Sequence, residues 1–256
     1  MITGEMGGLE PSGIRVLDEP TEPGEKAEYV RRMFDEIAPR YDLLNDLLSF
    51  YIHGTWRSFA ARCTALAPGD RVLDVCTGTG DFAVALRKRV GASGRVVGAD
   101  FSAAMLEAGA AKFDAHGVER RQADATALPF DDGEFDAATV GFGIRNVDRP
   151  VAAIKEMARV VRPGGRVVIL EFSQPSGIIK ALYDLHSRWV LPAVGGLISG
   201  RTEAYTYLPE SVKRWLTREE MAALMRNAGL ERVRWIDLTF GIVSVHVGEK
   251  PADAQL

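Results

Sequence analysis

Two carboxylates flank a glycine turn in residues 72–81, which read Val-Leu-Asp-Val-Cys-Thr-Gly-Thr-Gly-Asp. Asp74 lies in a short apolar run, and Gly78 and Gly80 allow a tight turn in which the backbone can approach a ligand closely. Asp100 follows at the end of the next apolar run, where a carboxylate can accept hydrogen bonds from two ribose hydroxyls. The spacing therefore predicts a strand–turn–helix–strand unit that binds a nucleoside.

The charges around this turn discriminate between two nucleoside cofactors. Residues 78–83 match G-x-G-x-x-A, a dinucleotide fingerprint that is weak on its own. A dinucleotide would place its pyrophosphate at the start of the following helix, where Asp81 would repel it, and Asp74 adds a second acid. Two acids suit a ligand with a cationic centre and no phosphate, so we expect S-adenosylmethionine (SAM) rather than NAD. The alternative is that Asp81 is only a favourable first-turn acid and Asp74 only a strand-end residue.

Composition sets the broad class of the protein. The chain has 256 residues, of which 46% are hydrophobic and 26% charged, as in ordinary globular proteins. Its net charge of −4 gives no general attraction to nucleic acid. The two cysteines have neither metal-ligand spacing nor a disulfide framework, so we expect no metal and a cytoplasmic protein. No secretion signal and no uncharged run of about twenty apolar residues is present.

The chain divides into a leader, one domain and a short tail. Residues 1–25 contain six acids, one arginine and no aromatic residue, which predicts a disordered leader. Residues 26–250 form a single predicted domain, with a helical cover at 26–67 and a lid or substrate insertion at 176–215. Residues 251–256 are the tail.

Strands and helices alternate after the helical cover. Continuous apolar runs are typical of strands that are covered on both faces, as in a parallel sheet. The last two strands are separated only by a tight turn at Gly241, so we expect them to pair antiparallel. The pattern predicts an α/β fold with a seven-stranded, mostly parallel, doubly wound sheet whose last strand is reversed. The expected strands are 71–76, 95–99, 119–123, 135–141, 166–172, 232–239 and 242–248, and the expected helices are 26–39, 41–51, 55–66, 80–90, 102–116, 148–161 and 218–228.

The loops at the carboxyl ends of the strands add further candidate cofactor contacts. Asp124 and Ala125 follow the third strand, where an aspartate could accept the adenine amino group. Gly141 ends the fourth strand, and its small size permits close approach to the methionine portion of SAM. Phe101 and Met105 follow Asp100 and are candidate adenine contacts. Each is weak alone, because such residues are more often solvated turns or core, but all fall on the same edge of the sheet.

Several longer motifs resemble the quinone-biosynthesis C-methyltransferases of the UbiE/MenG type. Tyr41-Asp-Leu-Leu-Asn45, with Ser49, His53 and Trp56, resembles their N-terminal signature. Residues 142–147, residues 159–173 and the stretch from Leu191 to Ser211 resemble other parts of the family. Two departures are visible, since Leu44 replaces a signature methionine and Tyr51 a signature glycine. The resemblance covers about residues 27–250.

The resemblance implies a Rossmann-like class I methyltransferase fold and SAM as the cofactor. It implies SAM contacts at Thr79, Asp100, Asp124, Ala125 and Gly141. The implied reaction is methylation of a ring carbon of a polyprenylated hydroquinone, which converts demethylmenaquinol to menaquinol or a methoxy-polyprenyl-benzoquinol to a ubiquinone precursor. The implied substrate contacts are Tyr41, Asn45 and Tyr205. Which ring and which tail length are used stays open.

The implied chemistry requires an activated carbon nucleophile. A phenolate pushes electron density onto the neighbouring ring carbon, so the site needs a base or a cation that stabilises the phenolate. Arg145 and Asn146 could hold and orient the phenolate oxygen, and His53 could accept the proton, a role typical of histidine. The alternatives are that Arg145 only pairs with Asp148 and that His53 only caps a helix.

Two other functions stay open from the residues alone. The first is SAM-dependent methylation of another lipid or small molecule, and the second, less favoured, is an NAD-linked oxidoreductase. Residues 178–199 are amphipathic, with Lys180, Asp184 and Arg188 on one helical stripe. This segment could contact the inner face of the membrane peripherally, pack on the core as a lid, or form a homodimer surface.

Overall fold

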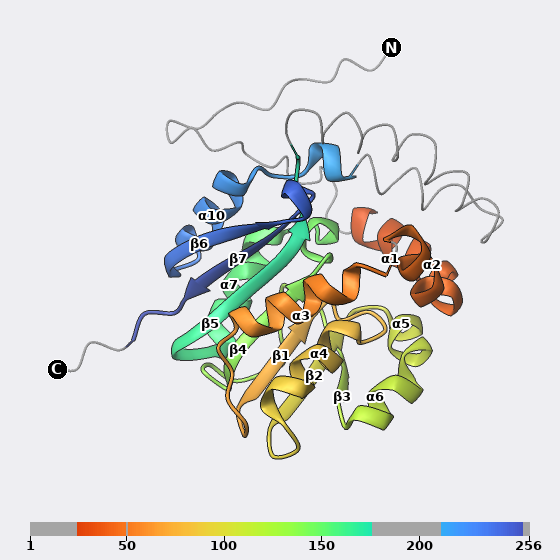
Figure 1. Ribbon diagram of the computed structural model, residues 1–256, viewed down its shortest axis with the longest axis horizontal. Coiled ribbons are helices and arrows are strands. Elements are labelled where there is room, and N and C mark those ends of the chain that lie inside the picture. Colours follow the sequence, from red (N-terminus) through yellow and green to blue (C-terminus); the bar gives the residue numbers. More distant parts are fainter. Residues whose placement is uncertain (1–24, 50, 176–210, 253–256) are drawn as a thin grey trace, which may run out of the picture.

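The computed structural model describes residues 25–49, 51–175 and 211–252 (Figure 1). Several sequence-based predictions lie outside these residues: the leader up to residue 24, the amphipathic segment 178–199, most of the lid insertion, and Tyr205.

The described strands form one seven-stranded sheet in the order β3-β2-β1-β4-β5-β7-β6. β7 pairs antiparallel with both β5 and β6, and the other pairs are parallel, so the predicted mostly parallel sheet with a reversed last strand is confirmed. The strand order reverses between β1 and β4, and this switch point is where open α/β sheets bind ligands. The strands are β1 (Arg71–Val75), β2 (Arg95–Asp100), β3 (Glu119–Gln122), β4 (Phe135–Gly141), β5 (Val161–Phe172), β6 (Glu231–Leu238) and β7 (Val243–Glu249).

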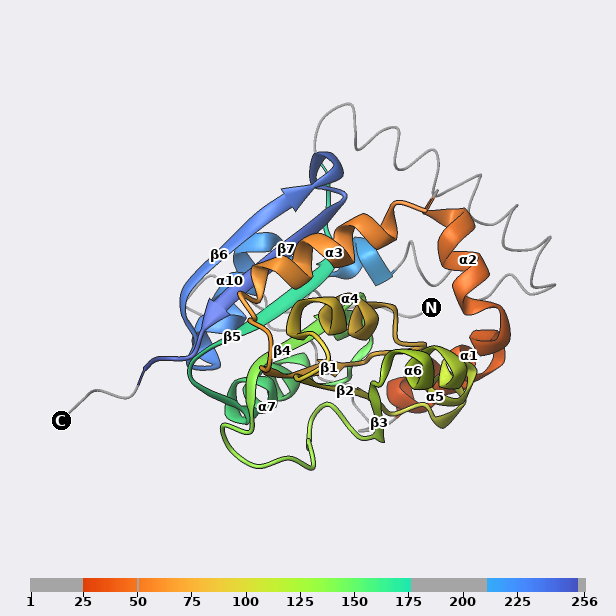
Figure 2. The same cartoon turned by 60° about the horizontal axis from the view of Figure 1, so that its bottom comes forward.

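Helices cover both faces of the sheet (Figures 1 and 2). One face carries α3, α4 and α6, and the other carries α7 and α10. Figure 1 shows α1 and α2 beside the carboxyl ends of the parallel strands. The helices are α1 (Glu25–Ile37), α2 (Tyr41–Leu48), α3 (His53–Cys63), α4 (Asp81–Val90), α5 (Ala103–Ala108), α6 (Ala110–His116), α7 (Pro150–Val160) and α10 (Arg218–Asn227), with 3₁₀ turns η1 (Ala38–Arg40), η2 (Ile144–Asn146) and η3 (Thr239–Gly241).

Alternating side chains of the strands build a separate core on each face. Val72 is fully buried against α3 and α4, whereas its neighbour Leu73 is fully buried in the core under α7 and α10. A capping box formed by Thr217 and Glu220 begins α10. Both cores therefore fix the strands whose ends carry the candidate site.

Several predicted boundaries were wrong by two or more residues, among them the ends of the three cover helices, and three others have a clear local reason. The helix expected at 102–116 divides at Gly109, where the backbone passes so close to the glycine turn that a Cβ would lie 2.5 Å from the Thr79 carbonyl oxygen. The strand expected at 166–172 begins at Val161, because Val161 already pairs with Phe135 across an irregularity in the ladder. The helix expected at 148 begins at Pro150, the residue type that favours a first helical position.

The N-terminal cover is fastened to the domain at both ends of α1. Lys26 Nζ donates to the carbonyl oxygens of Arg145 (3.3 Å) and Val147 (3.1 Å), in the loop after β4. At the other end, Ser102 Oγ donates to Asp35 Oδ1 at 2.5 Å, in the loop after β2. The cover helix α1 therefore spans the gap between two of the loops that form the site.

Candidate functional site

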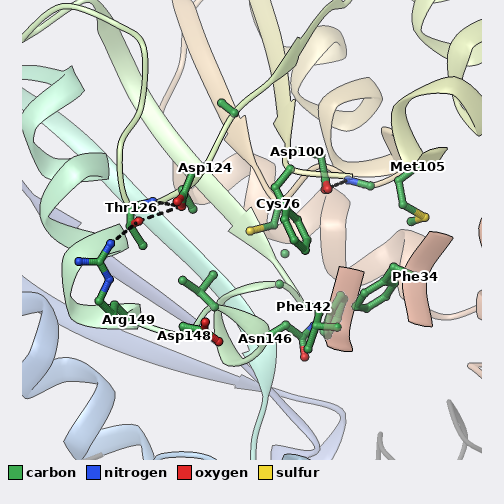
Figure 3. A pocket seen from close by; sticks show the side chains of 18 of the residues that line it. Phe34, Cys76, Asp100, Met105, Asp124, Thr126, Phe142, Asn146, Asp148 and Arg149 are labelled. Carbon is green, nitrogen blue, oxygen red and sulfur yellow. Dashed lines mark hydrogen bonds between the residues drawn. The ribbon is translucent and has the colours of Figure 1, made fainter. Parts of the chain in front are cut away.

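A cavity of about 620 Å³ opens at the carboxyl ends of β1, β2 and β4 (Figure 3). The switch point of the sheet and the cover helix α1 together form its walls. Its lining includes most of the residues that the sequence nominated: Tyr41, Gly78, Asp100, Phe101, Met105, Asp124, Ala125, Gly141 and Asn146. Asp74, Thr79, Gly80, Arg145, His53 and Asn45 are not among the described lining residues.

The glycine turn is joined directly to the end of β2. The backbone N–H of Gly78 donates to Asp100 Oδ2 at 2.8 Å, and the N–H of Ser102 donates to Oδ1 at 3.0 Å. Burial raises the pKa of Asp100 to about 6, although these backbone donors act in the opposite direction. A side chain at Gly78 would be strained, because φ is +57° and a Cβ would lie 3.2 Å from Met105 Cε. The turn therefore leaves the Asp100 carboxylate facing the cavity with spare acceptor capacity.

Asp74 lies behind the turn and is only 1% exposed. It accepts hydrogen bonds from Thr77 Oγ1 (2.6 Å) and Thr139 Oγ1 (2.7 Å), which join β1 to the turn and to β4. Burial raises the pKa of Asp74 to about 6, against these hydrogen bonds and the charge of Arg57. Asp74 therefore shapes the turn, while a direct contact with the cofactor stays a prediction.

Two non-glycine residues at the cavity have left-handed backbone conformations. Cys76 (φ +52°) follows β1 and Phe142 (φ +59°) follows β4, and both line the cavity. Gly143 permits the close approach of these two loops, since a Cβ there would overlap with Cys76 Cβ and lie 3.2 Å from its Sγ. Backbone strain of this kind is concentrated at functional sites. The residue types alone carried no signal of it, so the sequence missed both positions.

A polar network closes one end of the cavity. Asp124 Oδ1 accepts from the Thr126 N–H (2.8 Å) and Oγ1 (2.9 Å), and Arg149 Nη2 donates to Thr126 Oγ1 at 3.0 Å. Figure 3 shows these three side chains together at one side of the cavity. Arg149, which immediately precedes α7, therefore joins the loop after β3 to the loop after β4, a link that the sequence analysis missed.

Arg145 is buried in an ion pair. Its Nη1 lies 2.7 Å from Glu171 Oε1 and also donates to the Phe142 carbonyl oxygen, and its guanidinium packs on the Phe172 ring. The alternative prediction, that the Arg145 side chain only pairs with Asp148, was therefore wrong, because its ion pair is with Glu171. Burial raises the pKa of Glu171, and Arg145 acts against that rise. Arg145 holds the loop after β4 in shape, and Asn146 of the same loop lines the cavity.

Asp81, at the start of α4, is compensated by two cations. It forms ion pairs with Lys112 of α6 and with Arg57 of α3, the latter at 3.7 Å. Burial opposes its ionisation, but the charges of Arg57 and Lys112 outweigh burial, so the pKa of Asp81 is lowered. The expectation that Asp81 presents a free negative charge to a ligand was therefore wrong.

The helices α2 and α3 attach to the same cluster. Asp42 accepts from Thr79 Oγ1 at 2.5 Å and from Lys112 Nζ at 2.7 Å, which fixes α2 to the glycine turn. His53 Nε2 lies 2.7 Å from Asp46 Oδ1, and its other ring nitrogen contacts Arg57. His53 thus lies within the cluster rather than in the cavity lining, and its role as the base stays a prediction.

The sequence model of the ubiE/COQ5 methyltransferase family matches residues 23–250. The chain belongs to this family. Two similar curated proteins bear the name Ubiquinone/menaquinone biosynthesis C-methyltransferase UbiE. The protein from Geotalea uraniireducens is 47% identical over 231 residues, which are 88% of this chain and 98% of the relative. The protein from Hahella chejuensis is 42% identical over 88% of this chain and 93% of the relative.

Solved structures support the fold. A SAM-dependent methyltransferase from Thermotoga maritima, described as a possible histamine N-methyltransferase, superposes with a TM-score of 0.61 at 24% identity, over 86% of this chain and 99% of that chain. The [4+2]-cyclase SpnF superposes with a TM-score of 0.67 at 19% identity, over 91% and 98%. Because these names cover different chemistry, the fold alone does not define the reaction.

The family membership identifies the protein as a SAM-dependent methyltransferase, and the cavity fits that cofactor. We expect Asp100 to accept from the ribose hydroxyls and Asp124 from the adenine amino group, with apolar contact from Met105 and Phe101, all of which line the cavity. When bound, SAM supplies a sulfonium methyl group that is already activated for transfer. In the part of the chain that the structure describes, no group of acidic, histidine or cysteine side chains could hold a metal ion.

Proposed function

We propose that this protein transfers the SAM methyl group to a ring carbon of a polyprenylated hydroquinone in menaquinone or ubiquinone biosynthesis. The observation that carries the proposal is the match to a UbiE protein over 98% of that relative's length, at 47% identity. The match to the family model, residues 23–250, includes every described residue that lines the cavity.

The side chains that line the cavity suit a largely apolar acceptor. Val30 and Phe34 of the cover helix and Phe142 and Val147 of the loop after β4 are among them. A hydroquinone ring presents two apolar faces and two hydroxyl groups. Asn146 and Asp148 are polar groups on the same loop that line the cavity.

We assign the activation of the ring hydroxyl to this loop. The Asn146 amide can donate to the hydroxyl oxygen and hold it as charge develops there, and the Asp148 carboxylate can accept its proton. Arg145 fixes the loop from behind through Glu171 and the Phe142 carbonyl oxygen. Loss of Asn146 or Asp148 should therefore slow methyl transfer without weakening the binding of SAM.

The decisive experiment incubates the purified protein with SAM and a short-chain reduced quinol. Demethylmenaquinol and a methoxy-polyprenyl-benzoquinol are offered separately, and the product is identified by mass spectrometry. We expect one added methyl group on the ring carbon of at least one acceptor. The absence of methylation on both, with SAM binding intact, would overturn the proposal in favour of another lipid or small-molecule acceptor.

Two variants test the assigned roles. We expect Asn146→Ala and Asp148→Asn to lower kcat about 10- to 100-fold, the range of a lost proton-transfer or oxyanion contact. The affinity for S-adenosylhomocysteine, measured by calorimetry, should change less than about twofold. Asp131→Asn, at an exposed turn, is the matched control. Equal losses of kcat and cofactor affinity would refute these roles.

The proposal also concerns the place at which the protein binds its acceptor. No helix among the described residues is long and apolar enough to cross a membrane. A polyprenyl tail resides in lipid, so we propose a peripheral contact with the bilayer, which co-sedimentation with liposomes tests directly. A homodimer stays a prediction, which light scattering after size-exclusion chromatography would test.

A further inference from the structure

A small second cavity of about 20 Å³ adjoins the large one behind the glycine turn. Tyr41, Cys76, Gly78 and Gly141 line both cavities, so the two are neighbours across the turn. The small cavity is lined by charged and hydroxyl side chains: Arg57, Asp74, Thr77, Thr79 and Asp81. Nothing in the sequence had marked Arg57, and the activation of the acceptor does not use it.

Arg57 is a buried cation aimed at this junction. It lies on α3, its side chain is 8% exposed, and its guanidinium carbon lies 5.6 Å from the centre of the Phe142 ring. Its ion pair with Asp81, at 3.7 Å, is longer than a direct hydrogen bond. Among the described residues, its other polar contact is with a ring nitrogen of His53. A guanidinium has five N–H donors, so Arg57 retains donors for a further anion.

SAM has one anionic group, the α-carboxylate of its methionine portion. The candidate adenine contact, Asp124, lies in the loop after β3, and the candidate ribose contact, Asp100, is the last residue of β2. The methionine portion must therefore lie toward Gly78 and Gly141, where glycines permit close approach. This end of the large cavity is the end that the small cavity adjoins.

The distribution of cations singles out one side chain. Of the described residues that line the two cavities, Arg57 and Arg149 carry a positive charge. Arg149 lies at the opposite end and donates to Thr126, beside Asp124. Arg57 shares Asp81 with Lys112, and Lys112 is in turn shared with Asp42. Arg57 is therefore the cation positioned for an anion at the methionine end.

We propose that Arg57 binds the α-carboxylate of SAM at the junction of the two cavities. The inference concerns the cofactor alone and holds whichever acceptor is methylated. Its rival is that Arg57 serves only the structure, through Asp81 and the Phe142 ring. A structural role would weaken all adenosine ligands alike, whereas carboxylate recognition would weaken only the ligands that carry this group.

Decarboxylated SAM distinguishes the structural role of Arg57 from carboxylate binding, because it lacks only the carboxylate and keeps the adenosine, the sulfonium and the amine. Calorimetry should show that the wild-type protein binds SAM about 10- to 100-fold more tightly than decarboxylated SAM, the range of one buried charge-assisted hydrogen-bonded pair. Arg57→Met should bind both within about twofold of each other, with the affinity for decarboxylated SAM near that of the wild type. Arg57→Lys should keep part of the preference, because a lysine retains the charge without the planar fork.

The matched control is Arg62→Met, an exposed arginine on the same helix, which should retain the wild-type preference. Circular dichroism establishes that each variant is folded. The proposal is overturned if Arg57→Met retains the preference for SAM, or if it loses affinity for both ligands equally. If Arg57→Met does not fold, the ratio of the affinities for SAM and decarboxylated SAM in the wild-type protein and in Arg57→Lys still tests the proposal. A wild-type preference for SAM below about threefold contradicts carboxylate recognition.

Discussion

Gly80, at the end of the glycine turn, offers a direct test of how the turn is held. Its φ is +93°, and the buried ring of Phe113 from α6 packs against it. In Gly80→Ala, the new Cβ would lie 2.7 Å from Phe113 Cζ and 3.0 Å from Cδ1. Because Phe113 is fully buried, its ring has no free space to move into.

The expected loss of stability has two parts. A left-handed conformation costs a residue with a Cβ about 1–2 kcal/mol. Overpacking against a buried ring adds about 1–3 kcal/mol. We therefore expect Gly80→Ala to lower the free energy of unfolding by about 2–5 kcal/mol and to weaken SAM binding, since α4 and the turn must shift.

Gly229→Ala is the matched control for the backbone part. Gly229 has φ +89°, yet nothing lies within 4 Å of the position of its Cβ. Urea unfolding followed by circular dichroism should show a loss of only about 1–2 kcal/mol for this variant. The effect of alanine on the unfolded chain is common to both variants and cancels in the comparison.

The comparison can refute the reasoning in two ways. Equal losses in the two variants would mean that Phe113 yields without cost and that the packing argument is wrong. The double variant Gly80→Ala/Phe113→Leu should recover part of the stability lost by Gly80→Ala, because the shorter side chain leaves room for the Cβ. Strictly additive losses in the double variant would also contradict a direct clash.

The remaining predictions concern pH and the cover. Burial lowers the pKa of His246 to about 4, below its unfolded value of about 6.5, so its contribution of about 3 kcal/mol is present above pH 6.5 and is lost as the pH falls toward 4. Urea titrations at pH 7.5 and 4.5 should show that His246→Gln loses less free energy of unfolding between these pH values than the wild type does. An equal loss in both proteins would contradict this role of His246. Lys26→Met should lower kcat several-fold, with less change in affinity for S-adenosylhomocysteine, because the loop after β4 loses two hydrogen bonds. Lys88→Met, an exposed control, should leave kcat unchanged, and an equal effect of both changes would refute a role for the cover.

Patterns confined to single elements were readable from the sequence. The apolar runs and the Gly241 turn predicted the sheet and the reversed β7, because β1, β2, β4, β5 and β7 each carry a continuous buried run of their own. The division of the helix at Gly109 was not readable, since it depends on the approach of the Thr79 carbonyl oxygen. Contacts between distant segments decide such boundaries, and a local pattern does not contain them.

The residues of the candidate site also divide into those that a local pattern predicts and those that contacts between distant segments determine. Asp100, Asp124 and Gly141 could be nominated because the carboxyl ends of parallel strands meet at one edge. Arg57 could not be nominated, because α3 precedes the sheet in the chain and only its packing over Phe142 brings it to the turn. Arg145 was nominated by resemblance, but its partner Glu171 lies on the neighbouring strand β5 and was not foreseen.

The choice of SAM over a dinucleotide has a different physical basis from the one first inferred. Asp81 does not repel a phosphate through an unbalanced charge, since Lys112 and Arg57 compensate it. The start of α4 is instead occupied by the protein itself, because Asp42 of the cover binds Thr79 and Lys112 there. The N–H of Gly78, a natural phosphate donor, is likewise given to Asp100. A pyrophosphate would have to displace both carboxylates, whereas SAM carries no phosphate that competes with them.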